Sequence, residues 1–295
     1  MQRNSAFRRN SFYYILITPA VLLMVWLTVY PVLDVLVLSF YDYNYITDVR
    51  KFAGLKNFQQ ILSSELFRDS FVNTLIFSLA ATLIEVGLGL ALALAFDGEF
   101  FGKRHFMTVV IFPMMLSTMV VSAVWKTLYH QDIGLLNSIL KQLSLKPVGW
   151  LIDPSRALSS IIIVDIWQWT PFTFIMLQAS LQSIPREIFE AAQIDGARYP
   201  QIVFRITIPI LLGQILLIAM LRTIDTFKLF GKVYALTQGG PGNATETLST
   251  FIYREGFSYF NLGRAATASL LTLVIVSLIS LFYIKKLVQE EGPNG

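Results

Sequence analysis

The sequence contains no cysteine, which excludes a disulfide framework and any metal site built from thiolates. Its two histidines, His105 and His130, lie far apart and near the ends of apolar runs, so we expect interfacial positions for them and no metal site. Only 14% of the residues are charged, whereas a soluble domain has roughly 25%. The net charge of +4 is spread along the chain, without the basic stripe that a nucleic-acid partner requires.

Long apolar runs dominate the chain instead. Hydrophobic residues make up 55% of its 295 residues, and the mean hydropathy is +0.60. A helix of about 20 apolar residues crosses a bilayer. The sequence therefore predicts an all-α integral membrane protein, surrounded by membrane lipid, with six transmembrane helices. The six runs cover approximately residues 12–33, 71–96, 106–128, 158–181, 206–221 and 265–284.

The first run follows a basic segment with Arg3, Arg8 and Arg9. A secretory signal has this order of charge, but its apolar core is only about 7–15 residues, so we interpret the run as an uncleaved first span. Basic residues favour the cytoplasmic side of a span. The arginines before the first span and Lys285 and Lys286 after the last therefore predict that both termini are cytoplasmic. The total numbers of lysines and arginines oppose this orientation, and only their density per residue favours it, weakly.

The second span carries one ionisable residue and a row of small ones. Glu85 has to face the interior of the helix bundle or water at that depth, and a hydrogen bond to a neighbouring helix is favoured over a role in transport. Gly87 and Gly89 belong to the small residues that let a neighbouring helix approach closely. In the fourth span, Pro171 frees a backbone carbonyl and permits a kink.

A short helix is predicted in the polar segment between the fourth and fifth spans. Ser183 is suited to cap its N-terminus, and Pro185 suits its first turn, where no amide donor is lost. Gly196 is a natural C-terminal stop, because glycine adopts positive φ without cost. By local physics alone, this helix is equally well interpreted as a surface connector with no partner.

The spacing within this segment resembles that of a known family. Glu190-Ala191-Ala192 is followed after three residues by Gly196 and, nine residues later, by Ile206-Thr207-Ile208-Pro209. The pattern resembles the EAA loop of permease subunits of binding-protein-dependent ABC importers, with Ile-Pro where the family usually has Leu-Pro. The resemblance implies that residues 183–205 form a cytoplasmic coupling-helix loop that docks on an ATPase subunit. It assigns ATPase coupling to Glu190, Ala191, Ala192, Asp195, Gly196, Ile206 and Pro209.

The segment after the fifth span adds a second resemblance. It reads D-T-F-K-L-F-G-K-V-Y-A-L-T-Q-G-G-P over residues 225–241, and its glycines and proline predict a tight turn at 239–242. Together with W-Q-W-T-P-F at 167–172, it is similar to the first of the two permease subunits of carbohydrate ABC importers, the maltose and glycerol-phosphate type. The resemblance covers nearly the whole chain and implies a sugar or polyol cargo.

A carbohydrate pathway needs aromatic faces and a few polar groups amid apolar walls. Side chains of these kinds lie in or beside the fourth and fifth spans. For each one alone, hydrogen bonding between helices or anchoring at the membrane interface is the alternative. The candidates for the substrate pathway are Asp165, Trp167, Gln168, Gln178, Arg222, Asp225 and Tyr234.

The resemblance also implies a fold, a mechanism and partners. The fold is that of a type I ABC importer permease, in a single transmembrane domain over residues 1–295, and the mechanism is alternating access. The sequence has no G-x-x-x-x-G-K-[ST] motif, so we expect no enzyme and no cofactor in this chain, with ATP and Mg²⁺ in a partner. The implied partners are a second related permease subunit, a P-loop ATPase dimer and an extracytoplasmic solute-binding protein, at the cytoplasmic membrane of a bacterium or archaeon.

Two other classes of function compete with this one. An ion-coupled secondary transporter would use Glu85, Asp165 and Asp225 as coupling sites, but the sequence has no convincing inverted repeat with interrupted spans in paired positions. A membrane enzyme would need a cluster of His, Asp and Glu or a nucleophile motif, and the sequence has neither.

Overall fold

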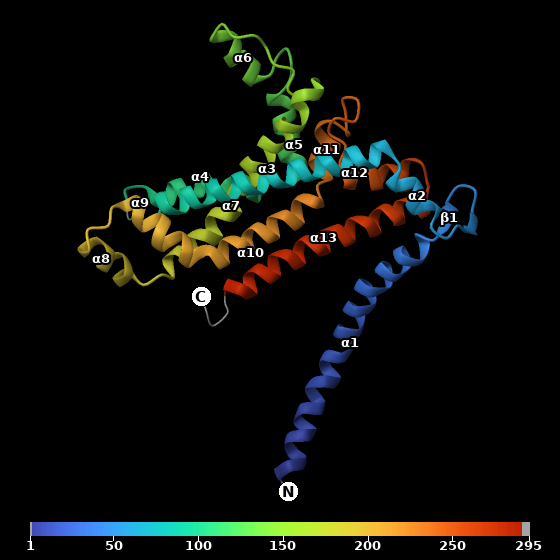
Figure 1. Cartoon of the computed structure of the whole chain (residues 1–295), viewed down its shortest axis with the longest axis horizontal. Coiled ribbons are helices and arrows are strands. Elements are labelled where there is room, and N and C mark those ends of the chain that lie inside the picture. The colour runs from blue at the N-terminus through green and yellow to red at the C-terminus, as the bar shows by residue number, and fades with distance from the viewer. Residues whose placement is uncertain (1, 99, 291–295) are drawn as a thin grey trace. The chain divides into compact units, whose positions relative to one another are not determined.

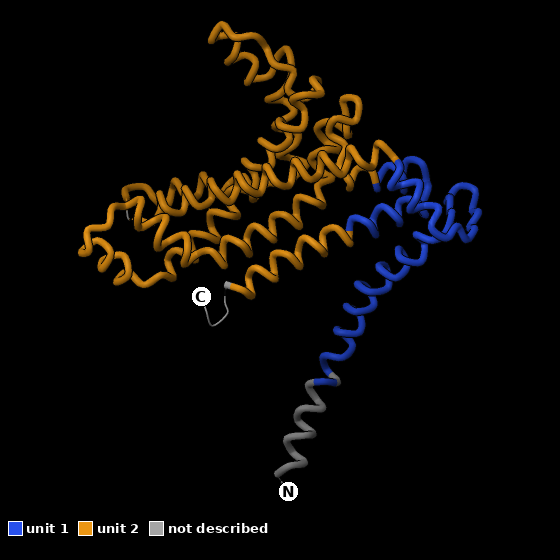
Figure 2. Tube along the Cα trace, viewed as in Figure 1, with its two compact units in different colours: residues 1–63, 252–272 blue, residues 64–251, 273–295 orange. Residues whose placement is uncertain are grey.

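The computed structural model describes residues 2–98 and 100–290 of the chain. Its Cα trace divides into two compact units, which Figure 2 shows in different colours. Unit 1 consists of residues 1–63 and 252–272, and unit 2 of residues 64–251 and 273–295. The helices α12 (Leu248–Tyr253) and α13 (Leu262–Glu290) continue from one unit into the other.

Unit 1 contains the predicted first span. The apolar part of α1 (Gln2–Leu38), from Leu16 to Leu38, has the length and hydropathy of a membrane span, and none of it is buried within the structure. The following segment forms a hairpin of two short antiparallel strands, which pairs Tyr41 with Phe52. The further elements of this unit are β1 (Tyr41–Asn44), β2 (Val49–Phe52), α2 (Lys56–Leu62), η2 (Arg254–Ser258), the end of α12 and the start of α13.

Hydrogen bonds from buried side chains hold the end of α1 in place. Asn57 Nδ2 donates to the carbonyls of Ser39 and Tyr41, at 3.1 and 2.8 Å. Thr267 Oγ1 also donates to the Ser39 carbonyl, at 3.1 Å. Buried main-chain carbonyls beyond a helix end need such partners. These bonds therefore join three stretches of unit 1 that are distant in the sequence.

Unit 2 is built around three long helices. Helices α3, α7 and α10 pack against one another (Figure 1). A Cβ atom at Gly89 of α3 would lie 2.1 Å from Thr173 Oγ1 of α7, so this close approach requires glycine and confirms the prediction for small residues there. The elements are α3 (Glu65–Ala95), α4 (Lys103–Met115), α5 (Thr118–Leu128), α6 (Leu135–Gln142), α7 (Pro154–Gln182), α8 (Arg186–Ile194), α9 (Tyr199–Ile202), η1 (Val203–Thr207), α10 (Ile208–Phe227), α11 (Gly231–Leu236), the start of α12 and the rest of α13.

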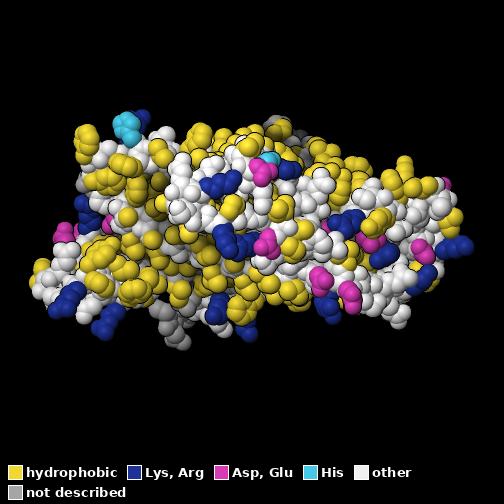
Figure 3. All heavy atoms as spheres, turned by 90° about the horizontal axis from the view of Figure 1, so that it is seen from above, with side chains coloured by type: hydrophobic (Ala, Val, Ile, Leu, Met, Phe, Trp, Pro, Cys, Tyr) yellow, Lys and Arg dark blue, Asp and Glu magenta, His cyan; other side chains and the backbone are white. Residues whose placement is uncertain are grey.

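The predicted all-helical membrane fold is confirmed, and the hairpin adds only two short strands to it. Five helices in the described residues have the length and hydropathy of membrane spans, and a sixth results if α4 and α5 are taken together as one span. Hydrophobic side chains are spread over much of the face seen in Figure 3. Extensive exposed apolar surface is typical of a protein that contacts lipid or other subunits.

The third predicted span, 106–128, is not one continuous helix. Helix α4 ends at Met115 and α5 begins at Thr118, and the two are bent by 99° relative to each other. Leu116 is extended, and Ser117 Oγ accepts a hydrogen bond from the Val120 amide at 3.3 Å, which starts the new helix. Because the sequence is apolar on both sides of this break, hydropathy alone predicted one continuous helix.

The polar segment before α10 confirms part of its prediction. Helix α8 forms, and Gly196 ends it with φ of +79°. Ser183, however, does not cap α8. Helix α7 continues to Gln182, so Ser183 ends that helix instead, and its Oγ donates to the Ser180 carbonyl at 2.7 Å. Pro185 consequently occupies the N-cap position of α8, one residue before the first turn.

The tight turn predicted at 239–242 is also confirmed. Residues 239–242 form a turn in which Gly239 and Gly242 adopt φ of +87° and +57°. Other residue types adopt these values only with strain.

Candidate functional site

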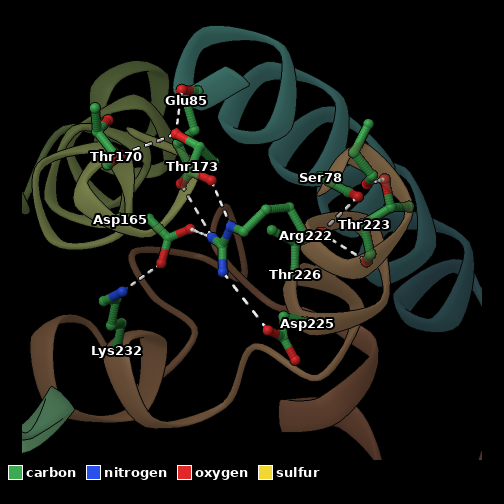
Figure 4. A network of polar contacts seen from close by, with 11 residues as sticks. Ser78, Glu85, Asp165, Thr170, Thr173, Arg222, Thr223, Asp225, Thr226 and Lys232 are labelled. Carbon is green, nitrogen blue, oxygen red and sulfur yellow. Dashed lines mark hydrogen bonds and ion pairs between the residues drawn. The ribbon is translucent and has the colours of Figure 1, made fainter. Parts of the chain in front are cut away.

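Charged side chains from α3, α7, α10 and α11 meet inside unit 2, as Figure 4 shows. Arg222 of α10 is only 2% exposed. Its Nε and Nη2 donate to the two carboxylate oxygens of Glu85 of α3, at 2.5 and 3.0 Å. Nη2 also donates to Asp165 Oδ2 of α7, at 3.0 Å. The two-point contact between Arg222 and Glu85 is the strong, directional form of an arginine–carboxylate pair.

Asp165 is shared between two cations. Its second oxygen, Oδ1, accepts a hydrogen bond from Nζ of Lys232, on the short helix α11. Asp165 and Lys232 are both almost completely buried.

We call Glu85, Asp165, Arg222 and Lys232 the buried ion cluster. It contains two acidic and two basic side chains, so its formal charge is balanced. This balance is necessary, because an unpaired buried ion costs several kcal/mol. The ring of Trp169 lies 5.0 Å from the Arg222 guanidinium carbon and adds a cation–π contact to the cluster.

At one edge, the buried ion cluster reaches an exposed ion pair. Asp225 lies one helical turn after Arg222, and its carboxylate is 3.8 Å from Arg222 Nη1. The Asp225 side chain is 48% exposed and forms a closer pair with Lys228, at 2.8 Å. Asp225 therefore links the interior charges to the surface of unit 2.

The structure thus brings together three of the substrate-pathway candidates, namely Asp165, Arg222 and Asp225. The two aromatic candidates lie elsewhere and are partly exposed, at 39% for Trp167 and 41% for Tyr234. Trp167 packs edge-on against Trp125 of α5. Tyr234 stacks on Phe230, with the ring centroids 5.2 Å apart.

The two glutamine candidates are buried and bind main-chain carbonyls. Gln168 Nε2 donates to the Leu116 carbonyl at 3.0 Å, and Gln178 Nε2 donates to the Phe96 carbonyl at 3.4 Å. The amide oxygens of both glutamines accept no hydrogen bond from the part of the chain that the structure describes. Each therefore retains an acceptor for a hydroxyl group or water.

Sequence reasoning missed two residues of this site, Lys232 and Trp169. The expected hydrogen bond from Glu85 to a neighbouring helix is confirmed by its contact with Arg222. Lys232 lies in a segment whose composition is that of a connection between spans. One signal was available: the predicted spans hold the acids Glu85 and Asp165 next to a single basic candidate, Arg222, so one more cation was needed to balance them.

The predicted coupling residues occupy a second region. Helix α8 is supported from beneath by an apolar cluster of Leu181, Ile184 and Leu211. Most of its predicted coupling residues face outward, because that support occupies only one side. Glu190, Ala191, Asp195, Gly196 and Pro209 are exposed, Ile206 is half-buried, and Ala192 is buried.

A cleft of about 770 Å³ lies beside α8. Its walls come from the ends of α3 and α7, the start of α4, and α8, α9 and η1. Side chains of both signs line it, with Asp97 and Glu190 against Lys103 and Arg186. In contrast to the buried ion cluster, these charges are accessible to a partner. Within residues 2–98 and 100–290, no group of three His, Asp or Glu side chains is placed to hold a metal ion.

Comparison with known families and proteins agrees with this arrangement. Residues 85–289 match the family described as "Binding-protein-dependent transport system inner membrane component". The chain is 40% identical over 243 residues to the probable ABC transporter permease protein y4oQ of Sinorhizobium fredii, which covers 82% of this chain and 78% of the relative. It is 34% identical over 283 residues to the trehalose/maltose transport system permease protein MalF of Thermococcus litoralis, which covers 95% and 94%.

A solved structure has the same fold. A chain of a bacterial alginate ABC transporter, crystallised in complex with an alginate pentasaccharide-bound periplasmic protein, superposes with a TM-score of 0.83. The match covers 95% of this chain and 94% of the other, at 23% sequence identity.

Proposed function

We propose that this chain, which belongs to the inner-membrane components of binding-protein-dependent ABC transport systems, moves a sugar, polyol or related carbohydrate into the cell. Membership of the family makes it a multi-pass permease subunit of the inner membrane. The ATPase of such a transporter is a separate subunit, so this chain is not itself an enzyme, and permease subunits of this family carry no cofactor.

One observation is the main support for a carbohydrate as the cargo. The trehalose/maltose permease is 34% identical to this chain over 95% of its length, which includes the region of every candidate pathway residue. The resemblance of residues 167–172 and 225–241 to carbohydrate permeases points in the same direction.

The proposed pathway uses the accessible candidates for direct contact. Trp167 and Tyr234 offer partly exposed rings to the C–H faces of a sugar. Gln168 and Gln178 are buried, so they are not among the candidates that a sugar reaches in this conformation. Asp225 is the exposed carboxylate among the candidates, whereas Asp165 and Arg222 are engaged with each other and hold the surrounding helices.

The proposed mechanism is alternating access driven by ATP. Closure of the ATPase dimer would move α8, and α8 would pass that movement to α7 and α10, with which it shares an apolar support. The exposure of Glu190 supports a polar contact with the ATPase, and the positive φ of Gly196 supports a sharp turn behind it. A second related permease subunit would complete the pathway, and a solute-binding protein would deliver cargo from outside.

The ion-coupled carrier loses its structural support. It required ionisable groups in the membrane that bind and release an ion. Two of its three carboxylates, Glu85 and Asp165, are instead paired with Arg222 and Lys232.

Purification of the tagged chain from its native membrane in mild detergent tests this proposal. We expect a second multi-span permease and a P-loop ATPase to copurify, and the solute-binding protein of the same system to bind a carbohydrate in a calorimetric screen. A binding protein that ignores sugars and polyols but binds amino acids or ions would overturn the cargo class. A chain that copurifies with no ATPase would overturn the proposed assembly.

A further inference from the structure

Two interruptions of helix in unit 2 contact the same face of α7. The first is the break at Leu116 and Ser117, between α4 and α5. The second is the break from Lys228 to Phe230, between α10 and α11. Main-chain groups that are buried at a helix break need hydrogen-bond partners within the protein. The contacts of these two breaks with α7 are therefore informative.

Two buried polar side chains on α7 bind residues at or directly after these breaks. Gln168 Nε2 donates to the carbonyl of Leu116, the residue at the first break. Asp165 binds the ammonium of Lys232, the second residue after the second break. Asp165 and Gln168 are three residues apart and thus share one face of the helix. Only 3% of Asp165 and 1% of Gln168 is exposed.

The segments that follow the two breaks also contact each other. A Cβ atom at Gly231 would lie 3.3 Å from Thr118 Cγ2, so the first residues of α11 and α5 are in contact. Further along, Lys126 Nζ of α5 donates to the Ala235 carbonyl of α11 at 3.1 Å. Helices α5 and α11 therefore form a pair, and α7 holds both members of it.

The Asp165–Lys232 contact and the Arg222–Glu85 contact join different pairs of helices. Arg222 joins α10 to α3, two long helices that also pack through apolar side chains. Helix α11 has only six residues, and its Val233 and Leu236 pack with side chains of α5 and α7 in one apolar cluster. A buried ion pair stabilises no better than apolar residues of the same size, but it specifies one partner geometry.

We propose that Asp165 is a positioning residue for transport: through Lys232, and together with Gln168, it makes α5 and α11 move with α7 when the permease changes conformation. This inference rests on the proposed function for its transport readout only. It assigns Asp165 no contact with cargo.

The absence of cysteine from this chain provides a direct test. In the assembled transporter, the reporter pair Thr118→Cys and Gly231→Cys measures whether α5 and α11 stay together. We expect the reporter chain to cross-link rapidly on mild oxidation, both without nucleotide and with ATP plus binding protein. Adding Asp165→Asn and Lys232→Met together removes both charges and leaves no unpaired ion, and we expect this variant to cross-link at least tenfold more slowly in one of the two states.

The transport readout separates positioning from folding. We expect the double variant to assemble but to lose at least tenfold in uptake, and the conservative Lys232→Arg variant to retain both uptake and cross-linking. Lys146→Met, at an exposed lysine outside the buried ion cluster, is the matched control and should change neither. Unchanged cross-linking and uptake in the double variant would overturn the proposal.

A further variant keeps the proposal testable if the double variant does not assemble. If the double variant does not assemble, Gln168→Leu, which changes no charge, decides the question: slower cross-linking supports the proposal and unchanged cross-linking overturns it. The cross-linking readout needs no knowledge of the cargo. If the reporter chain carried no carbohydrate at all, the proposed function would fail while cross-linking would still test the positioning role.

Discussion

The buried ion cluster and the α8 region each contain both acidic and basic side chains. Those of the cluster are buried, whereas those around α8 are exposed to solvent. In the cluster, Arg222 is 2% exposed and its carboxylate partners lie on other helices. Around α8, Glu190 and Asp195 are exposed, and beneath the helix lies an apolar support. A charge without water has to be balanced within the fold, whereas an exposed charge is available to a partner. Mutations in the first region should therefore affect folding, and those in the second should affect coupling.

The largest effect is expected at the centre of the cluster. Arg222→Met leaves Glu85 and Asp165 close together with only Lys232 to balance them, and removing one partner of a buried pair costs about 3–5 kcal/mol. We expect a strongly lowered unfolding temperature in detergent, or no recoverable protein. Arg68→Met is the matched control, because Arg68 is a 70% exposed arginine, and it should leave unfolding unchanged. Equal stability of the two variants would show that the cluster contributes nothing.

A smaller effect is expected where α3 meets α7. Gly89→Ala places a Cβ atom 2.1 Å from Thr173 Oγ1, so the helices have to separate, at a cost of about 1–3 kcal/mol. Gly87→Ala is the control, since a Cβ atom there meets nothing within 4 Å and alanine favours the helix. Thermal unfolding of the two variants should move in opposite directions. A stable Gly89→Ala variant would mean that α3 and α7 approach less closely than described.

At the end of α8 the effect should be mainly on function. Gly196→Val forces a β-branched residue to φ of +79°, which costs about 1–2 kcal/mol or displaces the turn. We expect a modest decrease in unfolding temperature and a larger loss of ATP-dependent uptake. Gly196→Asn tolerates this conformation better and should recover much of the uptake. If the valine variant transports normally, the turn does not control the position of α8.

The smallest effect on stability is expected at Glu190. Its side chain is exposed, so Glu190→Ala should leave the unfolding temperature unchanged while weakening the stimulation of ATPase activity by cargo-loaded binding protein. Glu187→Ala, at another exposed glutamate of α8, is the control and should retain most of that stimulation. Normal stimulation in the Glu190 variant would remove this residue from the coupling contact.

The two regions also differ in how well the sequence predicted them. The α8 region was predictable because its signals are local: Glu190-Ala191-Ala192, Gly196 and Pro209 lie within one short segment. The cluster was not, because residues 85, 165, 222 and 232 become neighbours only when four helices pack. Ser183 was assigned to the wrong helix because caps depend on where the preceding helix ends, and α7 continues to Gln182.

The break within the third span was hidden for a related reason. Hydropathy measures how apolar a run is, and residues 106–128 are apolar on both sides of Leu116. The local signals were Pro113 near the end of α4 and Ser117 as a cap for α5, but each also occurs in unbroken membrane helices. The bond from Gln168 to the Leu116 carbonyl comes from tertiary packing and has no counterpart in the local sequence.

Reconstitution of the complete transporter in liposomes tests most directly that this chain is the permease of an ATP-driven carbohydrate importer. The measurement is uptake of a labelled sugar, with its binding protein outside and ATP inside. We predict uptake that requires both ATP and the binding protein and that falls in the Glu190→Ala variant. Uptake that continues without ATP, or a complex that hydrolyses ATP but moves no carbohydrate with any binding protein of its system, would contradict this function.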